Sequence, residues 1–354
     1  MLSEATCLFH NTKYRAANRN NRTTFREGIV AAKKTAQKKA ESAKLPTPTG
    51  PHTPVSNVST ESMTAARPMR VEPQVPEGAK LPKTAGGTEV FAAAVSLEGA
   101  AAPPEARLTR KLFDIGMASF REPDVVLETV HGRDKRIRIT NGEPAQYPWS
   151  LNASLLITAH DGSQWIGTAW FISPRTLITA GHCIYITNSG VPGRDGWVKN
   201  IQVMPGRDET SLPFGIRTSA QFFTVKGWAD SGDENYDYGA IILPDKFTKD
   251  PGTIGFAAYA DAEMNAMVVN IAGYPGDQDS GTLWYDKRKV ASITGTKLFY
   301  DIDTAGGQSG AAVYQIDSTG ARIAVAVHAY GGAVTNSGTR ISAPVFANLT
   351  NWSM

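Results

Sequence analysis

Short hydrophobic runs separated by turn-forming residues make up the chain from about residue 137 onward. The runs include WIGTAWFI, TLITA, KNIQVM, YGAIIL, MVVNIAGY, KVASIT, KLFYDI, AAVYQI and RIAVAVHAY, with Gly, Pro, Asn and Asp between them. Many short strands at near-regular spacing are typical of an all-β barrel or sandwich. The pattern therefore predicts an all-β region, either one unit or two barrels of about 100 residues each.

The end of the chain has a different period. In SAPVFANLTNW, Val345, Leu349 and Trp352 fall on one face of a helix that follows a Ser-x-Pro start. The sequence therefore predicts one C-terminal helix over residues 343–352.

Residues 1–128 lack the strand pattern. The run AAKKTAQKKAESAK has a helical period but is mostly polar, and the segment that follows it is rich in Pro, Ser and Thr. Such a segment buries too little apolar area to fold by itself. We therefore expect a leader or propeptide over 1–128 that is largely disordered, followed by one folded region over 129–354.

Charge separates the same two parts. Residues 1–128 carry 18 Lys and Arg against 13 Asp and Glu, and residues 129–354 carry 18 against 20. The lysines of the leader lack interleaved aromatics and any recognised binding motif, so we expect a solvated helix and no nucleic-acid partner. No run approaches the ~20 apolar residues of a membrane span, and the first 30 residues lack the apolar core of a secretory signal. Cys7 and Cys183 provide no disulfide framework, and no metal site or cofactor is indicated.

Three motifs carry the residue types that a serine nucleophile needs. DTAGGQSGAAV surrounds Ser309 with glycines, LITAGHCIY places His182 in a turn after a strand, and NYDYGAIIL places Asp237 at the start of an apolar strand. A serine nucleophile needs a base to take its proton and a carboxylate to orient that base. We therefore expect His182, Asp237 and Ser309 to form a catalytic triad.

The order of these residues along the chain is informative. His, Asp, Ser is the chymotrypsin order, whereas α/β-hydrolases run Ser, Asp, His and subtilisins Asp, His, Ser. A hydrolase elbow also leads into a helix, but here GQSGA leads into a strand. In the remaining interpretation the N–H groups of Gly307 and Ser309 form an oxyanion hole, which a side chain at 307 would obstruct.

Several motifs together carry a family resemblance. TAGHC, NYDYGAI, GYPGD, DTAGGQSG, PGRDETS and GTRISAPVFANLTNW resemble the chymotrypsin-fold glutamyl endopeptidases of bacteria over nearly all of 129–354. The resemblance implies two perpendicular six-stranded antiparallel β-barrels, roughly 137–245 and 255–342, with the triad in the cleft between them. It also implies an extracellular serine endopeptidase that acts on protein or peptide substrates, and we expect a monomer.

The resemblance also assigns a specificity pocket. In that family a Thr before the nucleophile and a His on a later strand bind the substrate glutamate, and the matching positions are Thr304 and His328. A hydroxyl and an imidazole can both donate to a carboxylate. Asp303, however, stands where trypsin-like enzymes place the acid that binds Arg or Lys, so specificity for Arg or Lys remains an alternative.

Two bonds are candidates for maturation. Glu128-Thr129 precedes TVHGRDKRIRITN, which resembles the mature start of the glutamyl enzymes, where the freed α-amino group of Thr129 would help bind the substrate carboxylate. Arg138-Ile139 resembles a trypsinogen activation site, but the residue before the serine is Gln308, which has no charge to pair with a new N-terminus. We therefore expect Thr129 to be the mature N-terminus. A catalytically silent relative that binds peptides in the same cleft is the alternative from a different class.

Overall fold

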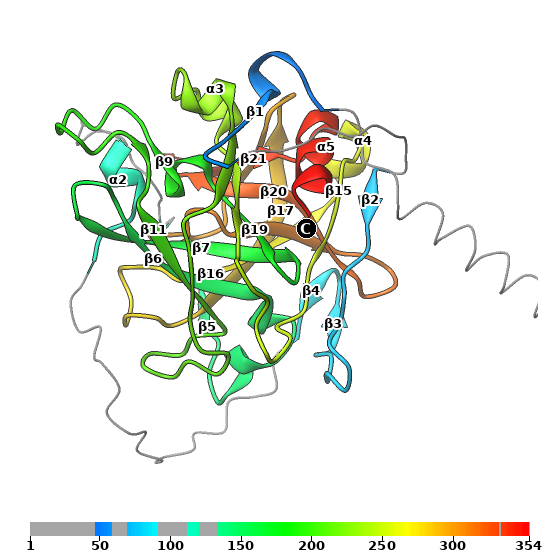
Figure 1. Cartoon of the computed structure of the whole chain (residues 1–354). Helices are drawn as coiled ribbons and strands as arrows, with labels where there is room; N and C mark the ends of the chain where they lie inside the picture. Colours follow the sequence, from blue (N-terminus) through cyan, green and yellow to red (C-terminus); the bar gives the residue numbers. More distant parts are fainter. Residues whose placement is uncertain are drawn as a thin grey trace, which may run out of the picture.

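Two curved β-sheets contain most of the strands in the computed structural model, which describes residues 47–58, 69–90, 112–119, 130, 133–332 and 334–353 (Figure 1). One sheet uses residues 152–242 and the other uses residues 255–340. Side chains from both sheets, including Leu155 and Val327, share the largest hydrophobic core. The two sheets therefore meet along a buried face, and the loops at its edge can combine residues from both.

The first sheet is a curved half-barrel with the strand order β1-β13-β14-β8-β7-β6-β11-β12. Strand β12 at one edge and β13 near the other are separated along the chain by only Ala220 and Gln221. Within 152–242 its strands are β6 (Asn152–Thr158), β7 (Gln164–Ser173), β8 (Thr176–Thr179), β11 (Asn200–Pro205), β12 (Arg217–Ser219), β13 (Phe222–Val225) and β14 (Gly239–Ile242).

The second sheet closes into a six-stranded barrel. Its order is β19-β16-β17-β18-β21-β20, and β19 also pairs with β20, which completes the ring. The barrel strands are β16 (Val268–Gly273), β17 (Trp284–Ile293), β18 (Lys297–Tyr300), β19 (Ala312–Ile316), β20 (Arg322–Tyr330) and β21 (Asn336–Arg340). Outside the ring, β15 (Gly255–Ala257) runs parallel to β20, and β5 (Ile137–Arg138) pairs with β17.

Short elements connect and cover the sheets. The C-terminal helix α5 (Ala343–Trp352) buries Val345, Leu349 and Trp352, the face expected from the sequence. The other short elements are β9 (Tyr185–Ile186), β10 (Gly196–Trp197), α3 (Lys226–Ala229), α4 (Asp261–Met264), and 3₁₀ turns at Glu143–Ala145, Trp149–Leu151, Gly181–Cys183 (η4) and Glu234–Tyr236 (η5). The all-β, chymotrypsin-like fold is confirmed, with one closed barrel and one half-barrel in place of two closed barrels.

Parts of the leader are ordered against the sheets. Strand β1 (Pro54–Ser56), which follows the 3₁₀ turn η1 (Gly50–His52), adds to β13, and β2 (Arg70–Val71) adds to β15, at the sheet edges in Figure 1. A small hairpin of β3 (Thr84–Ala85) and β4 (Thr88–Glu89) follows, and α2 (Gly116–Ser119) lies further along. For these segments the expectation of disorder does not hold, because a sheet edge supplies the backbone hydrogen bonds that a polar segment cannot supply for itself.

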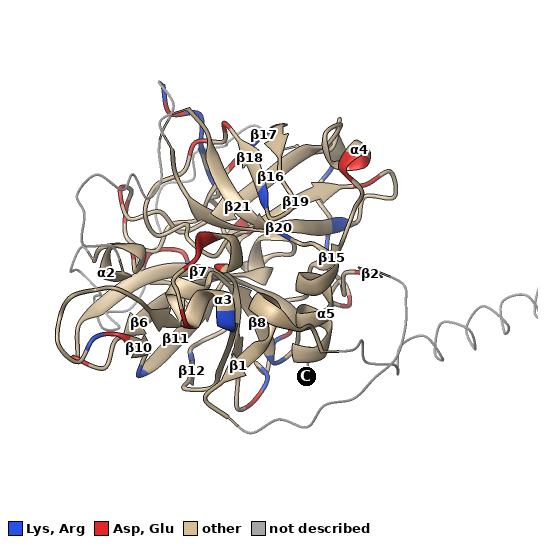
Figure 2. Cartoon of the chain, turned by 90° about the horizontal axis from the view of Figure 1, so that it is seen from above, with Lys and Arg blue, Asp and Glu red and all other residues tan. Residues whose placement is uncertain are grey.

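Charges are mixed over the described part of the chain. Figure 2 shows Lys and Arg interspersed with Asp and Glu along the ribbon. Among the described residues, no helix has both the length and the hydrophobicity required to cross a membrane.

Candidate active site

The His182 imidazole and the Asp237 carboxylate are in direct contact. His182 lies in η4 after β8, and Asp237 lies between η5 and β14. Their Nδ1 and Oδ2 atoms are 2.7 Å apart, and the second carboxylate oxygen accepts the backbone N–H of His182 at 2.9 Å. A side chain at Gly181 would meet Asp237 Oδ1 and the Trp228 ring at 2.9 Å, so glycine is required for this approach. Asp237 therefore fixes both the ring and the backbone of His182.

The protonation of this pair follows from burial and charge. Burial opposes the charged form of His182, but the Asp237 carboxylate, with Cys183, raises the pKa of His182 well above its ordinary value. Burial likewise opposes ionisation of Asp237, but His182 lowers the pKa of Asp237 below its ordinary value. The pair is therefore arranged to stabilise an imidazolium against a carboxylate, which a general base needs after it takes a proton.

Ser309 lies in the glycine-rich loop between β18 and β19. Gly307 has a φ of 108° and Gly310 a φ of 89°, backbone angles that residues with a side chain rarely adopt. A Cβ at Gly307 would lie 2.5 Å from the carbonyl oxygen of Tyr274, and one at Gly310 would clash with the Thr179 hydroxyl. The glycines are therefore required by both conformation and space.

The first sheet holds this loop in place. The N–H of Thr168 in β7 donates to the carbonyl of Ser309 at 2.9 Å, and its hydroxyl donates to the carbonyl of Gly307 at 2.7 Å. The buried thiol of Cys183, next to His182, lies 3.7 Å from the Ser309 carbonyl oxygen. The structure thus brings Ser309 to the same site as His182 and Asp237.

The hydroxyl of Ser309 donates to an acid that sequence reasoning did not find. Its Oγ is 3.3 Å from Oδ1 of Asp114, a leader residue that is only 4% exposed. Among the described residues, Nε2 of His182 has no hydrogen-bond partner. The one sequence signal for Asp114 is a carboxylate inside the apolar run LFDIGMAS, a composition that is unusual in the polar leader.

His328 is positioned beside the nucleophile. Its backbone carbonyl accepts the N–H of Gly310 at 2.7 Å, and its own N–H donates to the carbonyl of Ala311 at 2.9 Å. Its ring Nδ1 lies 2.7 Å from the Tyr300 hydroxyl. Burial, together with the charges of His182 and Lys297, lowers the pKa of His328 to about 3, so the ring is neutral at ordinary pH.

The other residues expected in the pocket have different surroundings. The hydroxyl of Thr304 is buried and has no hydrogen-bond partner among the residues that the structure describes. The Asp303 carboxylate accepts the backbone N–H of Lys135 at 3.0 Å and lies 3.8 Å from the Arg288 guanidinium. Thr129, expected at the mature N-terminus, lies outside the described residues.

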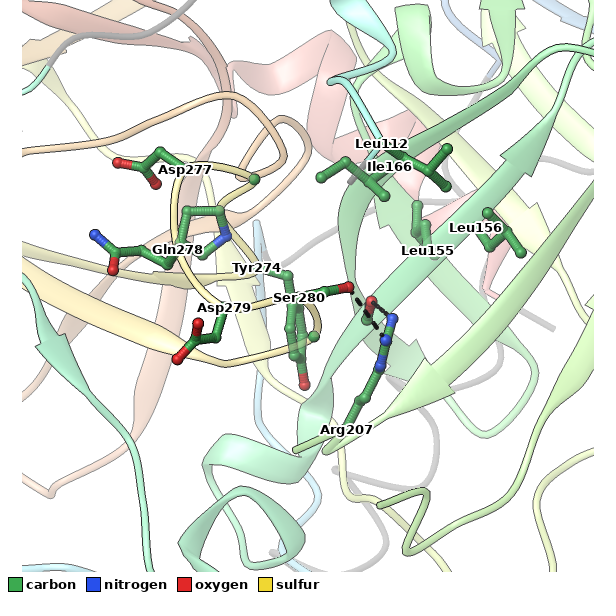
Figure 3. A pocket seen from close by; sticks show the side chains of 14 residues that line it. Leu112, Leu155, Leu156, Ile166, Arg207, Tyr274, Asp277, Gln278, Asp279 and Ser280 are labelled. Carbon is green, nitrogen blue, oxygen red and sulfur yellow. Dashed lines mark hydrogen bonds between the residues drawn. The ribbon is translucent and has the colours of Figure 1, made fainter. Parts of the chain in front are cut away.

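A cavity of about 430 Å³ flanks the site (Figure 3). Leu155, Leu156 and Ile166 form an apolar side of this cavity, and Leu112 of the leader also lines it. Below these side chains in Figure 3, the Arg207 guanidinium approaches the hydroxyls of Ser154 and Ser280 at 3.4 and 3.5 Å. Within the described ranges no three His, Cys, Asp or Glu side chains gather in a way that could hold a metal ion.

Comparison with known proteins agrees with this geometry. Residues 137–352 match the family described as Trypsin. A glutamyl endopeptidase from Bacillus licheniformis is 40% identical over 64% of this chain and 69% of its own. A protein named extracellular metalloprotease from Bacillus subtilis is 36% identical over 64% of this chain and 70% of its own. A solved structure of a Glu endopeptidase in complex with MPD superposes with a TM-score of 0.54 at 25% identity, covering 63% of this chain and 99% of that one.

The fold, the site and these matches define the class: the chain belongs to the trypsin family and is a serine endopeptidase. Within that family it groups with the bacterial glutamyl endopeptidases.

Proposed function

We propose that the protein cleaves peptide bonds after glutamate, with His182, Asp237 and Ser309 as its triad. His182 takes the proton of Ser309 as the hydroxyl attacks the peptide carbonyl, and then gives that proton to the leaving amine. Asp237 orients the imidazole and stabilises its charged form. The N–H groups of Gly307 and Ser309 hold the oxyanion, and water then releases the acyl group from Ser309 by the same steps.

The observation that carries this proposal is the 2.7 Å contact between His182 and Asp237 next to a serine in a glycine-lined loop. Labelling of the processed enzyme with a fluorophosphonate tests it, because this reagent modifies only an activated serine. We expect rapid labelling that is abolished in Ser309→Ala. Equal labelling of Ser309→Ala, or none of the native enzyme, would reject the triad in favour of a silent peptide-binding relative.

Preference for glutamate is supported by the state of His328. Because the ring is neutral, a Tyr300 hydroxyl that donates to Nδ1 leaves the proton on Nε2, which can then donate to a substrate carboxylate. The buried Thr304 hydroxyl is a second donor for the same carboxylate. A neutral His328 lacks the charge attraction that an imidazolium would have for the substrate carboxylate, but it avoids the high cost of a buried cation when no substrate is bound.

The surroundings of Asp303 weaken the Arg or Lys alternative. The carboxylate already accepts the N–H of Lys135, and Arg288 supplies a nearby positive charge. The side chain of a substrate Arg or Lys would have to compete with both groups for the Asp303 carboxylate. Glu specificity therefore remains compatible with an acid at 303.

Maturation at Glu128-Thr129 is favoured by the segment that follows it. Lys135 and Arg136 contact Asp303 and Gln308, so this segment runs along the wall of the pocket. Six extended residues span about 20 Å, which is enough for a new N-terminus at Thr129 to reach the pocket. By contrast, Ile139 is fully buried and its N–H donates to the carbonyl of Leu283 at 2.9 Å, so cleavage after Arg138 would require this buried residue to be pulled out.

The same proposal places the enzyme outside the cell as a monomer that acts on proteins or peptides, without a nucleic-acid or membrane partner.

A further inference from the structure

The side chain of Asp114 occupies the position where a reacting carbonyl oxygen belongs. Its Oδ2 accepts the N–H of Gly307 at 2.6 Å, and its Oδ1 accepts the Ser309 hydroxyl at 3.3 Å. Its Oδ1 also accepts the N–H of Gly116 at 2.7 Å, so the carboxylate is held from its own side as well. Burial raises the pKa of the Asp114 carboxyl, and His182 together with these hydrogen-bond donors acts against that rise. Such donors bind the ionised carboxylate in some of the strongest hydrogen bonds that proteins make.

This arrangement blocks the chemistry in two ways. A donor of the oxyanion hole is already used by a carboxylate, which offers Ser309 no peptide carbonyl to attack. The serine hydroxyl also points its proton at Asp114, while Nε2 of His182 has no hydrogen-bond partner within the described part of the chain. In this arrangement the serine proton is therefore directed at Asp114.

The backbone of the leader is docked like an added strand. The N–H of Ile166 in β7 donates to the carbonyl of Phe113, and the N–H of Ile115 donates to the carbonyl of Ile166, both at 3.0 Å. The β-bridge between Asp114 and Ile166 is parallel. The group that reaches Ser309 is the Asp114 side chain and not a peptide bond. Such main-chain pairing supplies affinity, while pockets for alternate side chains supply selectivity.

The side chains of the segment fit the groove. Ile115 is fully buried, Ala118 and Ser119 are almost fully buried, and Phe113 and Met117 face solvent at 62% and 50% exposure. Gly306 leaves space for the Asp114 side chain, since a Cβ at position 306 would lie 3.0 Å from the Asp114 Cβ.

We propose that residues 112–119 are an inhibitory peptide ligand of the active site, with the Asp114 carboxylate seated in the oxyanion hole. The cleft thus binds an acidic peptide that it cannot cut at this point. The covalently linked leader is that peptide in the precursor, and the same sequence inhibits when it is supplied as a separate molecule. This inference rests on the proposed triad for its effect on activity, but not for the binding itself.

The first test uses the full chain with processing prevented by Glu128→Gln. The rate at which a fluorophosphonate labels Ser309 is compared in this precursor, in the precursor with Asp114→Ala, and in the precursor with Glu77→Ala as a matched control. Loss of hydrogen bonds to a charged group should speed labelling by roughly 10- to 100-fold in Asp114→Ala. The Glu77→Ala control should label as slowly as the parent, because this exposed acid lies outside residues 112–119.

The second test does not depend on folding of a variant or on catalysis. A synthetic peptide of sequence LFDIGMAS is titrated into the processed wild-type protein, and binding is measured by calorimetry beside a peptide with Asn in place of Asp. We expect the first peptide to bind at least about tenfold more tightly than the second and to slow labelling competitively.

Equal affinity of the two peptides, or no binding of either, would overturn the inference even if the enzyme proves fully active. If the processed enzyme does label, equal labelling rates for the parent precursor and Asp114→Ala would overturn it as well. Conversely, selective binding of the Asp peptide to a protein that labels nowhere would support the ligand site and reject the triad, so the two failures are distinguishable.

Discussion

At the scale of the residue, the proposed proton transfer depends on the charge that Asp237 places beside His182. Only neutral His182 can accept a proton, so activity falls as pH drops through its pKa. Because the pKa of His182 is raised, the acid limb of kcat/KM should lie above the value for an ordinary imidazole. Removing the Asp237 carboxylate should therefore change the pH profile measurably.

In Asp237→Asn we expect kcat/KM at neutral pH to fall about 10⁴-fold. The residual activity should show an acid limb shifted to lower pH, since the main interaction that raises the pKa of His182 is gone. Complete pH profiles of the processed enzyme check both effects. An acid limb that does not move would show that Asp237 does not control this histidine.

The specificity residues allow a second prediction at this scale. His328→Ala and Thr304→Val should each lower kcat/KM for Glu substrates by roughly 10- to 100-fold, because each removes a hydrogen bond to a charged group. Cleavage after Gln should change much less, so the ratio of Glu to Gln cleavage should collapse. His160→Ala, at an exposed position, is the control. An unchanged ratio in the pocket variants would exclude these two residues from glutamate binding.

The candidate site residues that could be named from the sequence are those that stand in short, recognisable motifs. Gly307 and Ser309 stand together in one loop, and the histidine turn and the aspartate before β14 are each recognisable in a few letters. The Asp114 contact could not be predicted, because it joins Asp114 to Ser309 across 195 residues through a docking mode that no local pattern encodes.

At the scale of the element, sheet edges bind the leader. Glu89 of β4 is buried and paired with the buried Arg322 guanidinium at 2.9 and 2.6 Å. Removing one member of a buried pair leaves the other uncompensated. The hairpin of β3 and β4 therefore supplies the carboxylate that pairs with the buried Arg322 of the barrel.

Glu89→Gln should accordingly lower the unfolding free energy of the full chain by about 3–5 kcal/mol. Glu72→Gln is the control, since the exposed Arg70–Glu72 pair should contribute no more than about 1 kcal/mol. Urea unfolding followed by tryptophan fluorescence measures both. Equal losses in the two variants would show that the buried pair does not stabilise the precursor.

Hydrophobic runs predicted strands well because burial of alternate or successive apolar residues is a local signal. Each of the nine runs overlaps a strand, and RIAVAVHAY spans all of β20. Strand β21 was missed, because NSGTR is polar although every residue in it is buried. Its polar side chains are hydrogen-bonded to residues that are distant in the sequence. Asn336 donates to the carbonyl of Ile302, and Thr339 donates to the carbonyl of Asp237.

At the scale of the whole molecule, the proposed active site lies where the half-barrel meets the closed barrel. His182 and Asp237 come from the half-barrel and Ser309 comes from the closed barrel, while Asp114 contacts Ser309. Cleavage at Glu128-Thr129 should therefore both free the site from Asp114 and create a new N-terminus. Mass spectrometry of the purified active enzyme should find Thr129 as its first residue. An active enzyme that begins at Ile139 or Met1 would contradict this scheme.

Cleavage of a mixed peptide library by the processed enzyme tests the central claim most directly. The account predicts that cuts fall after Glu, with few after Arg or Lys, and that Ser309→Ala makes none above background. Cuts that fall mainly after Arg or Lys, or cuts that persist in Ser309→Ala, would contradict it.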